Sequence, residues 1–240
     1  MKARFRWRAW KARFRDQRAE LAVIRREIRR GQTVCDIGAN KGSFTYWLAK
    51  WAWPGRVVAF EPQAELAEYV RLACQALGLT NVTVEAKAVH ARSGVLSLFI
   101  PGEKDSPGAT LVAKAAAGAP GRSVEVPVVS LDEYFPADVP ISVLKVDVEG
   151  AERGVFEGAQ RILRQYGPLL VFECENRHLE SGSVHDVFAY LEQFGYQGSF
   201  VCGSRLRPLA EFDAAIHQRN DGERFWDAKD YCNNFVFRKA

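Results

Sequence analysis

From residue 31 onward, short apolar runs alternate with segments in which apolar residues recur every three or four positions. The runs have the length of buried strands, and the intervening segments have the period of amphipathic helices. Strands are predicted at 33–37, 56–60, 82–85, 94–100, 123–129, 141–146, 169–173, 196–201 and 234–238. Helices are predicted at 43–51, 64–77, 152–165 and 184–194. This alternation predicts an α/β fold, a doubly wound and mostly parallel sheet with helices on both faces.

The first 30 residues follow a different pattern and contain neither Gly nor Pro. A series with alternating spacings of three and four, typical of one helical face, runs through Trp7, Trp10, Phe14, Gln17, Leu21, Ile24 and Ile28. Arginines fill most of the remaining positions. We therefore expect a basic amphipathic helix over 1–31 that ends at Gly31, followed by one domain at 32–240.

Charge separates these two parts of the chain. Residues 1–30 contain twelve Lys or Arg and three Asp or Glu, a surplus of nine positive charges, whereas the whole chain carries +4. The remainder is therefore net negative by five charges. We expect the basic helix to pack on its own domain or to mediate self-association, with contact to an anionic membrane surface as the alternative. Because the body is acidic, no nucleic-acid partner is expected.

The composition is that of an ordinary globular domain. No apolar run approaches the roughly 20 residues that span a bilayer, and the N-terminus lacks a secretory signal pattern. The five cysteines form no CxxC pair and do not cluster with the four histidines, so a zinc site is not expected. These features predict a cytoplasmic protein, with the inner membrane face as an alternative location for the basic helix.

A glycine-containing turn follows the first predicted strand. Gly38 and Gly42 bracket this turn, where backbone can approach a ligand closely. Ser43 is predicted to cap the next helix. The GxxxG spacing differs from both the dinucleotide fingerprint and the P-loop, which argues against a nicotinamide dehydrogenase. Asp36 is predicted to cap the turn or to face an ammonium group, and Asn40 to bond a carboxylate or the turn backbone.

An acid follows the second predicted strand in the string PheGluPro at 60–62. Glu61 lies 19 residues after Gly42, and an acid at about this interval suits binding of ribose hydroxyls. The turn and this acid together predict a site for a nucleoside-containing ligand at the carboxyl ends of the strands.

Three blocks in this order resemble the FkbM family of S-adenosylmethionine-dependent methyltransferases. They are ValCysAspIleGlyAlaAsnLysGlySerPhe at 34–44, AlaPheGluPro at 59–62, and SerLeuAspGluTyr at 130–134 leading to LysValAspValGluGlyAlaGlu at 145–152. The resemblance implies a class I methyltransferase fold with a seven-stranded, Rossmann-like sheet. It also implies methylation of a hydroxyl on a sugar, a glycan, or a glycosylated or polyketide-like metabolite.

The same resemblance implies where S-adenosylmethionine binds. The turn would hold its methionine part, Glu61 its ribose, and the stretch after the third strand its adenine. The implied cofactor residues are Asp36, Gly38, Ala39, Asn40, Gly42, Ser43, Phe60, Glu61, Pro62, Lys87, Ala88, Val89 and Asp147. At Lys87 only the position matches the family pattern. The partner would be a small-molecule or glycan acceptor.

Titratable side chains also follow the strands predicted at 141–146 and 169–173. If the first strand extends far enough, Lys145, Asp147 and Glu149 share one face of it. Methyl transfer to a hydroxyl needs a base, and Asp147 is the first candidate and His178 the second. Lys145 and Glu173 are the other catalytic candidates.

Two questions remain open in the sequence. Asp147 with Glu173 or Glu175 would suit magnesium, but the ligand set is incomplete, so we assign no metal. The loops 101–122 and 174–183 are expected to shape the acceptor pocket.

Alternatives to the metabolite methyltransferase are a nucleic-acid or protein methyltransferase and a non-catalytic nucleotide-binding scaffold. The AsnProProTyr-type and ProCys motifs of nucleic-acid methyltransferases do not occur.

Overall fold

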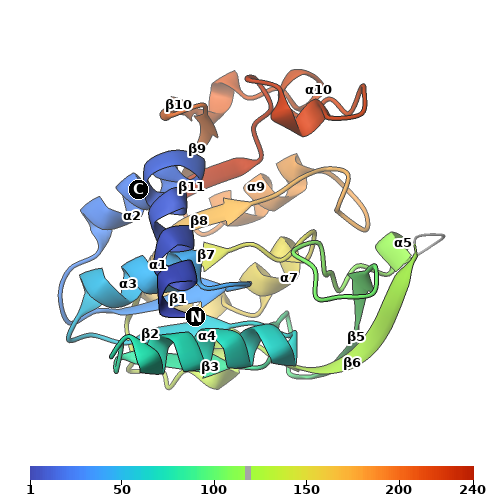
Figure 1. The fold of residues 1–240 in the computed structure, drawn as a ribbon. Coiled ribbons are helices and arrows are strands. Elements are labelled where there is room, and N and C mark those ends of the chain that lie inside the picture. Colours follow the sequence, from blue (N-terminus) through green and yellow to red (C-terminus); the bar gives the residue numbers. More distant parts are fainter. Residues whose placement is uncertain (117–119) are drawn as a thin grey trace.

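A computed structural model describes residues 1–116 and 120–240 (Figure 1). Within these ranges the central sheet has eight strands in the order β10-β9-β11-β8-β7-β1-β2-β3. They are β1 (Thr33–Ile37), β2 (Val57–Phe60), β3 (Val82–Glu85), β7 (Ile141–Val146), β8 (Leu169–Glu173), β9 (Tyr196–Cys202), β10 (Arg205–Pro208) and β11 (Asn234–Lys239). β3, β2, β1, β7 and β8 run parallel, and β11, β9 and β10 pair antiparallel.

The doubly wound, mostly parallel fold is therefore confirmed, with one strand more than expected. The additional strand is β10, which forms an edge hairpin with β9. All its residues are exposed, so it has no apolar run from which the strand could be predicted. The strands predicted at 94–100 and 123–129 lie outside the central sheet. They form a second sheet in the order β4-β6-β5, from β4 (Ala88–Val89), β5 (Gly94–Pro101) and β6 (Gly121–Val129).

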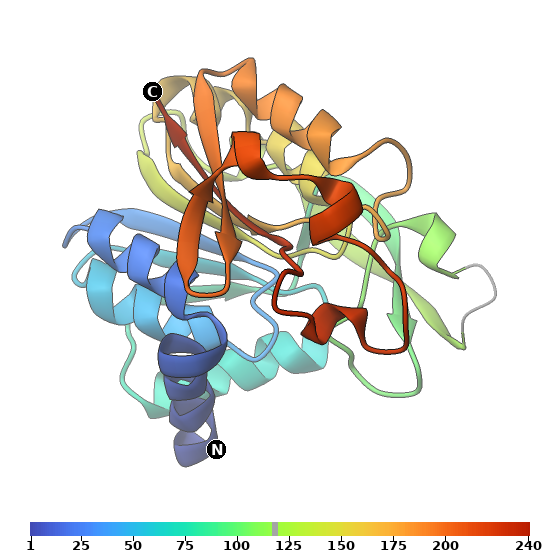
Figure 2. The same cartoon turned by 90° about the horizontal axis from the view of Figure 1, so that it is seen from above.

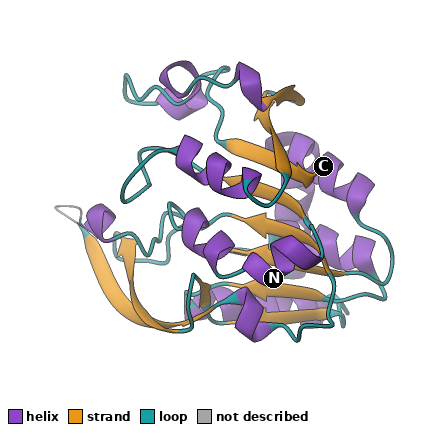
Figure 3. Ribbon diagram, turned by 180° about the vertical axis from the view of Figure 1, so that it is seen from behind, coloured by secondary structure: helices purple, strands orange, loops and turns teal. Residues whose placement is uncertain are grey.

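Helices cover both faces of the central sheet (Figure 3). The longer ones are α3 (Ser43–Ala52), α4 (Ala64–Ala76), α7 (Glu152–Glu157), α8 (Gln160–Gln165) and α9 (Val184–Glu192). Short helices are α5 (Ala113–Ala116), α6 (Leu131–Tyr134) and α10 (Ala214–His217). The helix predicted at 152–165 is divided because Asp132 caps the start of α8, accepting from the amides of Arg161 at 2.7 Å and Ile162 at 3.1 Å.

The core lies on both faces of the sheet, and the central strands are its least exposed part. β2 is buried along its whole length, and β1 and β7 are buried at nearly every position. On one face, aromatic rings from β8, β11 and α9 pack together, among them Phe172, Phe188 and Phe235. The tips of these central strands are therefore rigidly placed, which suits a functional site at their carboxyl ends.

The N-terminal segment is not one helix. It consists of α1 (Lys2–Lys11), a π-helical turn at Ala12–Asp16, and α2 (Arg18–Glu27), so it ends before Gly31. The π turn inserts an extra residue, seen as the Gln17 amide bonding the Ala12 carbonyl at 2.8 Å. This insertion rotates the buried face by part of a turn.

The predicted buried stripe is consequently correct in α2 and wrong in α1. Leu21 and Ile24 are buried in α2, but α1 buries Phe5 and Ala9 against α3 and α4, and leaves Trp7 exposed. Figure 2 shows α1 projecting from the body with the N-terminus at its outer end. Within the described ranges, no helix combines the length and the apolar character needed to cross a membrane.

Candidate functional site

A cavity of about 270 Å³ opens where the carboxyl ends of β1, β2, β7 and β8 meet. Predicted site residues in its wall are Gly38, Asn40, Phe60, Glu61, Pro62, Lys87, Ala88, Val89, Asp147 and Glu173. The other predicted residues do not line it: Asp36, Ala39, Gly42, Ser43, Lys145 and His178. The wall also contains residues that sequence reasoning missed, among them Gln17, Gln63 and Glu149.

Gly38 lets the end of β1 pack directly on the end of β7. Its φ is +76°, and a Cβ there would lie 1.7 Å from the backbone oxygen of Asp147. The amides of Gly38 and Ala39 both donate to the Phe60 carbonyl, at 3.0 and 2.9 Å. The turn is thus fixed between its two neighbouring strands, and a side chain at this position would force the strand ends apart.

The start of α3 differs from the expectation. Gly42, with φ +75°, is the N-cap, and Ser43 is already helical and makes no capping hydrogen bond. Glycine suits this N-cap position for a steric reason, because a Cβ at Gly42 would lie 2.6 Å from the ring of Phe5 in α1. The N-terminal helix therefore packs against the turn, and only glycine leaves room for it.

Glu61 joins the turn to the end of β2. Its side chain is 2% exposed and accepts from the Asn40 amide at 2.7 Å and from the Gln63 amide at 3.0 Å. Burial raises the pKa of Glu61, and these hydrogen bonds oppose that rise. Glu61 lines the cavity, as the ribose interpretation requires, and it also holds the loop in place. Its contact with ribose stays a prediction.

Asp36 lies behind the cavity and bonds no turn amide. It is fully buried, accepts from Thr45 Oγ1 at 2.5 Å, and lies 3.4 Å from Lys145 Nζ. Lys145 Nζ also lies 3.4 Å from Asp147 Oδ2 and donates to the Gly38 carbonyl at 3.0 Å. Burial lowers the pKa of Lys145, but Asp147 and Asp36 outweigh it, so the pKa is raised. The ammonium therefore links the ends of β1 and β7.

Asn40 lines the cavity and carries a buried polar atom without a partner. Its Oδ1 is buried without a hydrogen-bond partner among the described residues, and its φ of +47° is uncommon outside glycine. An orphaned acceptor of this kind costs free energy unless a ligand supplies a donor. The residues of the turn thus fit a ligand with an ammonium group, such as the methionine part of S-adenosylmethionine.

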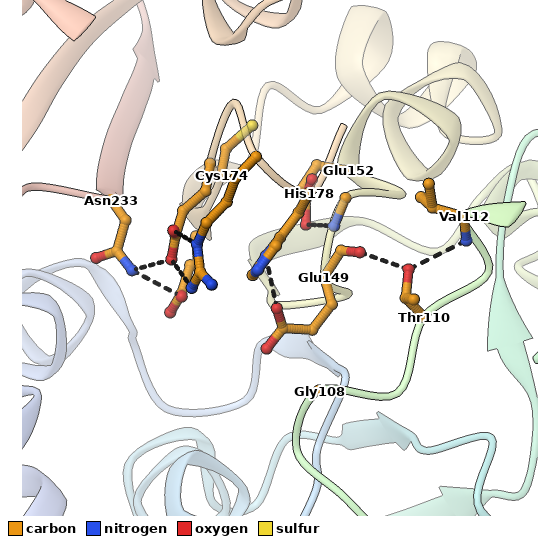
Figure 4. Close-up of polar contacts among 12 residues, drawn as sticks. Gly108, Thr110, Val112, Glu149, Glu152, Cys174, His178 and Asn233 are labelled. Carbon is orange, nitrogen blue, oxygen red and sulfur yellow. Dashed lines mark hydrogen bonds and ion pairs between the residues drawn. The ribbon is translucent and has the colours of Figure 1, made fainter. Parts of the chain in front are cut away.

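Glu149 and His178 form a pair that the sequence pattern does not reveal (Figure 4). β7 ends at Val146, so the strand alternation expected through Glu149 does not hold. Glu149 has φ +52°, and its Oε2 lies 2.7 Å from His178 Nδ1. Its carbonyl accepts from Thr110 Oγ1 at 2.5 Å. Burial lowers the pKa of His178, but the Glu149 carboxylate more than compensates, so the pKa lies above its usual value.

A second cavity of about 420 Å³ adjoins this pair. Its wall contains Thr110, Lys114, Glu149, Arg177 and His178. Glu149 also lines the first cavity and is therefore shared by both. The loops predicted to shape an acceptor pocket supply much of this wall. Within the first of these loops, residues 117–119 lie outside the described ranges.

Gln63 anchors one of these loops to the first cavity. Its side-chain amide donates to the Ser106 carbonyl, and its Oε1 accepts from the Ser106 amide, both at 2.9 Å. Pro107 and Ala109 of the same loop line the cavity. The 43 positions between Gln63 and Ser106 explain why no local pattern indicated this contact.

Two acids at the carboxyl end of β8, Glu173 and Glu175, are bonded to other side chains of the same chain. Glu175 pairs with Arg177 and accepts from Tyr231, and its pKa falls to about 2 because these hydrogen bonds outweigh burial. Asn233 Nδ2 donates to Glu173 at 2.7 Å and to Glu175 at 2.8 Å. Burial, and then Asp147 and Glu149, raise the pKa of Glu173 well above its usual value.

These contacts leave the magnesium alternative without support. In residues 1–116 and 120–240, no group of three or more His, Cys, Asp or Glu is arranged to hold a metal ion. Lys87, at the other end of the cavity, is held by Glu85 at 3.1 Å.

Comparisons with known proteins agree with this architecture. A family model described as the methyltransferase FkbM domain matches residues 36–197, more than half of the chain. A search of curated proteins found no match.

Two solved structures share the fold. A methyltransferase FkbM from Methylobacillus flagellatus has a TM-score of 0.55 and 14% identity over 87% of this chain, which spans 43% of the length of that protein. A Streptococcus mutans protein described as a methyltransferase, in complex with SAH, has a TM-score of 0.53 and 13% identity, covering 92% of this chain and 96% of its own. At these identities, the likeness concerns the fold.

Proposed function

Because this chain belongs to the FkbM methyltransferase family and has the class I fold of S-adenosylmethionine-dependent methyltransferases, we propose that it methylates a hydroxyl oxygen. The acceptor is a sugar, a glycan, or a glycosylated or polyketide-like metabolite. One observation carries the proposal: the cavity at the strand ends, with the Gly38 turn and Glu61 in its wall, shares Glu149 with a second cavity, and Glu149 pairs with a histidine.

The first cavity is assigned to the cofactor. Asn40 Oδ1 offers an acceptor to the ammonium of the methionine part, and Glu61 lies where ribose hydroxyls would be bound. The apolar side chains of Val89 and Leu98 line the same cavity and suit a flat adenine ring. The bound cofactor supplies an electrophilic methyl group, so the protein must orient the acceptor and remove its proton.

The second cavity is assigned to the acceptor, with His178 as the general base. Its Nδ1 is held by Glu149, and no described residue bonds its Nε2, which is therefore free to take a hydroxyl proton. The Glu149 carboxylate then stabilises the imidazolium that forms. Asp147, held by Lys145, is assigned to the cofactor side and to positioning. Orientation of the acceptor and removal of its proton together lower the barrier to methyl transfer.

Calorimetry and a methyl-transfer assay test this proposal. The protein is expected to bind S-adenosylmethionine and S-adenosylhomocysteine, and not NAD. Assayed by mass spectrometry on glycans and glycosylated metabolites, His178→Asn should lower kcat by about 10²- to 10⁴-fold, since general base catalysis contributes about this much. His185→Asn, an exposed histidine in α9, is the matched control. A well-folded protein without affinity for either adenosyl compound would exclude the proposed function.

A further inference from the structure

One face of the N-terminal segment 2–16 is uncovered and aromatic. Trp7, Trp10 and Phe14 are 62%, 56% and 53% exposed, although side chains of this size are normally covered. Trp7 and Trp10 are three positions apart on one helical face, and the rings of Trp10 and Phe14 are 4.4 Å apart. The opposite face is fully used, because Phe5 and Ala9 are buried in the body. The ring of Phe14 also lies 6.3 Å from that of Trp47, but more than half of the surface of each of the three aromatic residues remains uncovered.

The same segment carries a concentrated positive charge. Its basic residues are Lys2, Arg4, Arg6, Arg8, Lys11, Arg13 and Arg15. Asp16 is its single acidic residue and pairs with Lys11 at 3.2 Å and with Arg15 at 2.7 Å. Among the residues that the structure describes, no carboxylate forms an ion pair with Arg4, Arg6 or Arg13. Most of this charge is therefore available to a partner.

We propose that this face docks on the surface of an anionic phospholipid bilayer. Tryptophan and phenylalanine suit the boundary between headgroups and acyl chains, and basic side chains are attracted to anionic headgroups. Figure 2 shows that α1 projects from the body, so a flat surface can reach it. The segment would lie in the plane of the interface, with the body on the aqueous side.

Charge disfavours the two other occupants of such a face. A second copy would place the same cations opposite one another in a two-fold contact. A nucleic acid would meet the cationic segment but also residues 31–240, which are net negative by five charges. This inference does not depend on the proposed function, since none of the aromatic residues lines the catalytic cavities.

Vesicle co-sedimentation of the full chain provides the test. Wild-type protein is expected to sediment with vesicles of phosphatidylcholine and phosphatidylglycerol in equal parts, and to remain in solution with phosphatidylcholine alone. Substituting Trp7, Trp10 and Phe14 together by Ala should abolish sedimentation. The double variant Arg4→Gln with Arg6→Gln should weaken partitioning about fivefold per charge removed, an effect that added salt diminishes.

Matched controls separate docking from misfolding. Trp226→Ala and Arg205→Gln replace exposed residues of the same types elsewhere and should leave sedimentation unchanged. Affinity for S-adenosylhomocysteine should be the same in all these variants, because the cavity is untouched. Equal binding to neutral vesicles, no binding to either, or an unchanged triple variant would overturn the proposal. So would a concentration-dependent dimer, or binding to duplex DNA, that requires the three aromatic residues.

Discussion

At the scale of single residues, the pair Glu149–His178 determines how activity should depend on pH. The base must be unprotonated, so the rate of methyl transfer should rise with pH through the pKa of His178. Glu149 raises that pKa by stabilising the imidazolium. In Glu149→Gln this contribution is lost, so the midpoint of the pH–rate profile should move to lower pH while kcat falls. The measurement is kcat against pH for both proteins.

Asp147→Asn provides the contrasting variant at the same scale. If His178 is the base, this change should weaken cofactor binding but leave the pH midpoint close to that of the wild type. A pH dependence that disappears in Asp147→Asn, with an unchanged midpoint in Glu149→Gln, would instead identify Asp147 as the base. The two carboxylates are thus distinguished by the pH profile and not by a loss of rate, which either variant could cause.

At the scale of elements, the contact between the ends of β1 and β7 depends on Gly38. We expect Gly38→Ala to destabilise the protein by several kcal/mol and to abolish cofactor binding, because the new Cβ would overlap the Asp147 backbone. Gly78→Ala is the matched control. Gly78 also has a positive φ, +66°, but nothing lies within 4 Å of a Cβ there, so only about 1 kcal/mol of strain is expected.

Denaturant unfolding and calorimetry with S-adenosylhomocysteine measure the two effects. Equal destabilisation in both variants would mean that backbone strain, and not the packing of β1 on β7, explains the requirement for glycine. A Gly38→Ala protein that binds the cofactor normally would contradict the assigned role of the turn.

Elements that a local pattern specifies could be predicted from the sequence. β1, β7 and β8 begin and end where the apolar runs do, because a strand buried on both faces leaves a continuous signal. The break between α7 and α8 depends on the Asp132 side chain about 30 positions away. The π turn at 12–16 and the exposed edge strand β10 likewise carry no periodic signal.

The residues of the candidate site also fall into two groups, those that a local sequence pattern indicates and those that it does not. Gly38, Glu61 and Asp147 follow strands within recognisable strings, and all three line the cavity. Glu149 and Gln63 were missed, because their partners His178 and Ser106 are distant in sequence and only the fold brings them together. Asp36 is predicted from the sequence to contact the ligand, but its contacts with Thr45 and Lys145 hold it behind the cavity wall.

At the scale of the whole molecule, a buried acid should make stability depend on pH. Burial raises the pKa of Glu20 in α2 from 4.5 to about 7. Folding therefore favours the protonated form, so this stability is complete below about pH 4.5 and is lost as pH rises toward 7. Glu20→Gln should raise the free energy of unfolding by about 2–3 kcal/mol near pH 8, and change it little near pH 4.

Urea unfolding at the two pH values measures this difference, with the exposed Glu65→Gln as control. A gain of the same size at both pH values would show that packing rather than ionisation is responsible. A loss at the higher pH would mean that the charged Glu20 is stabilised by contacts other than its own helix backbone.

The position of Gln17 bears on whether the N-terminal segment can be removed. This residue follows the π turn and forms part of the wall of the cavity at the strand ends. Phe5, further upstream, fills the space beside Gly42. The end of the N-terminal segment is therefore part of the cavity wall. A protein shortened to begin after residue 17 would lack this part of the wall and leave the cavity open to water.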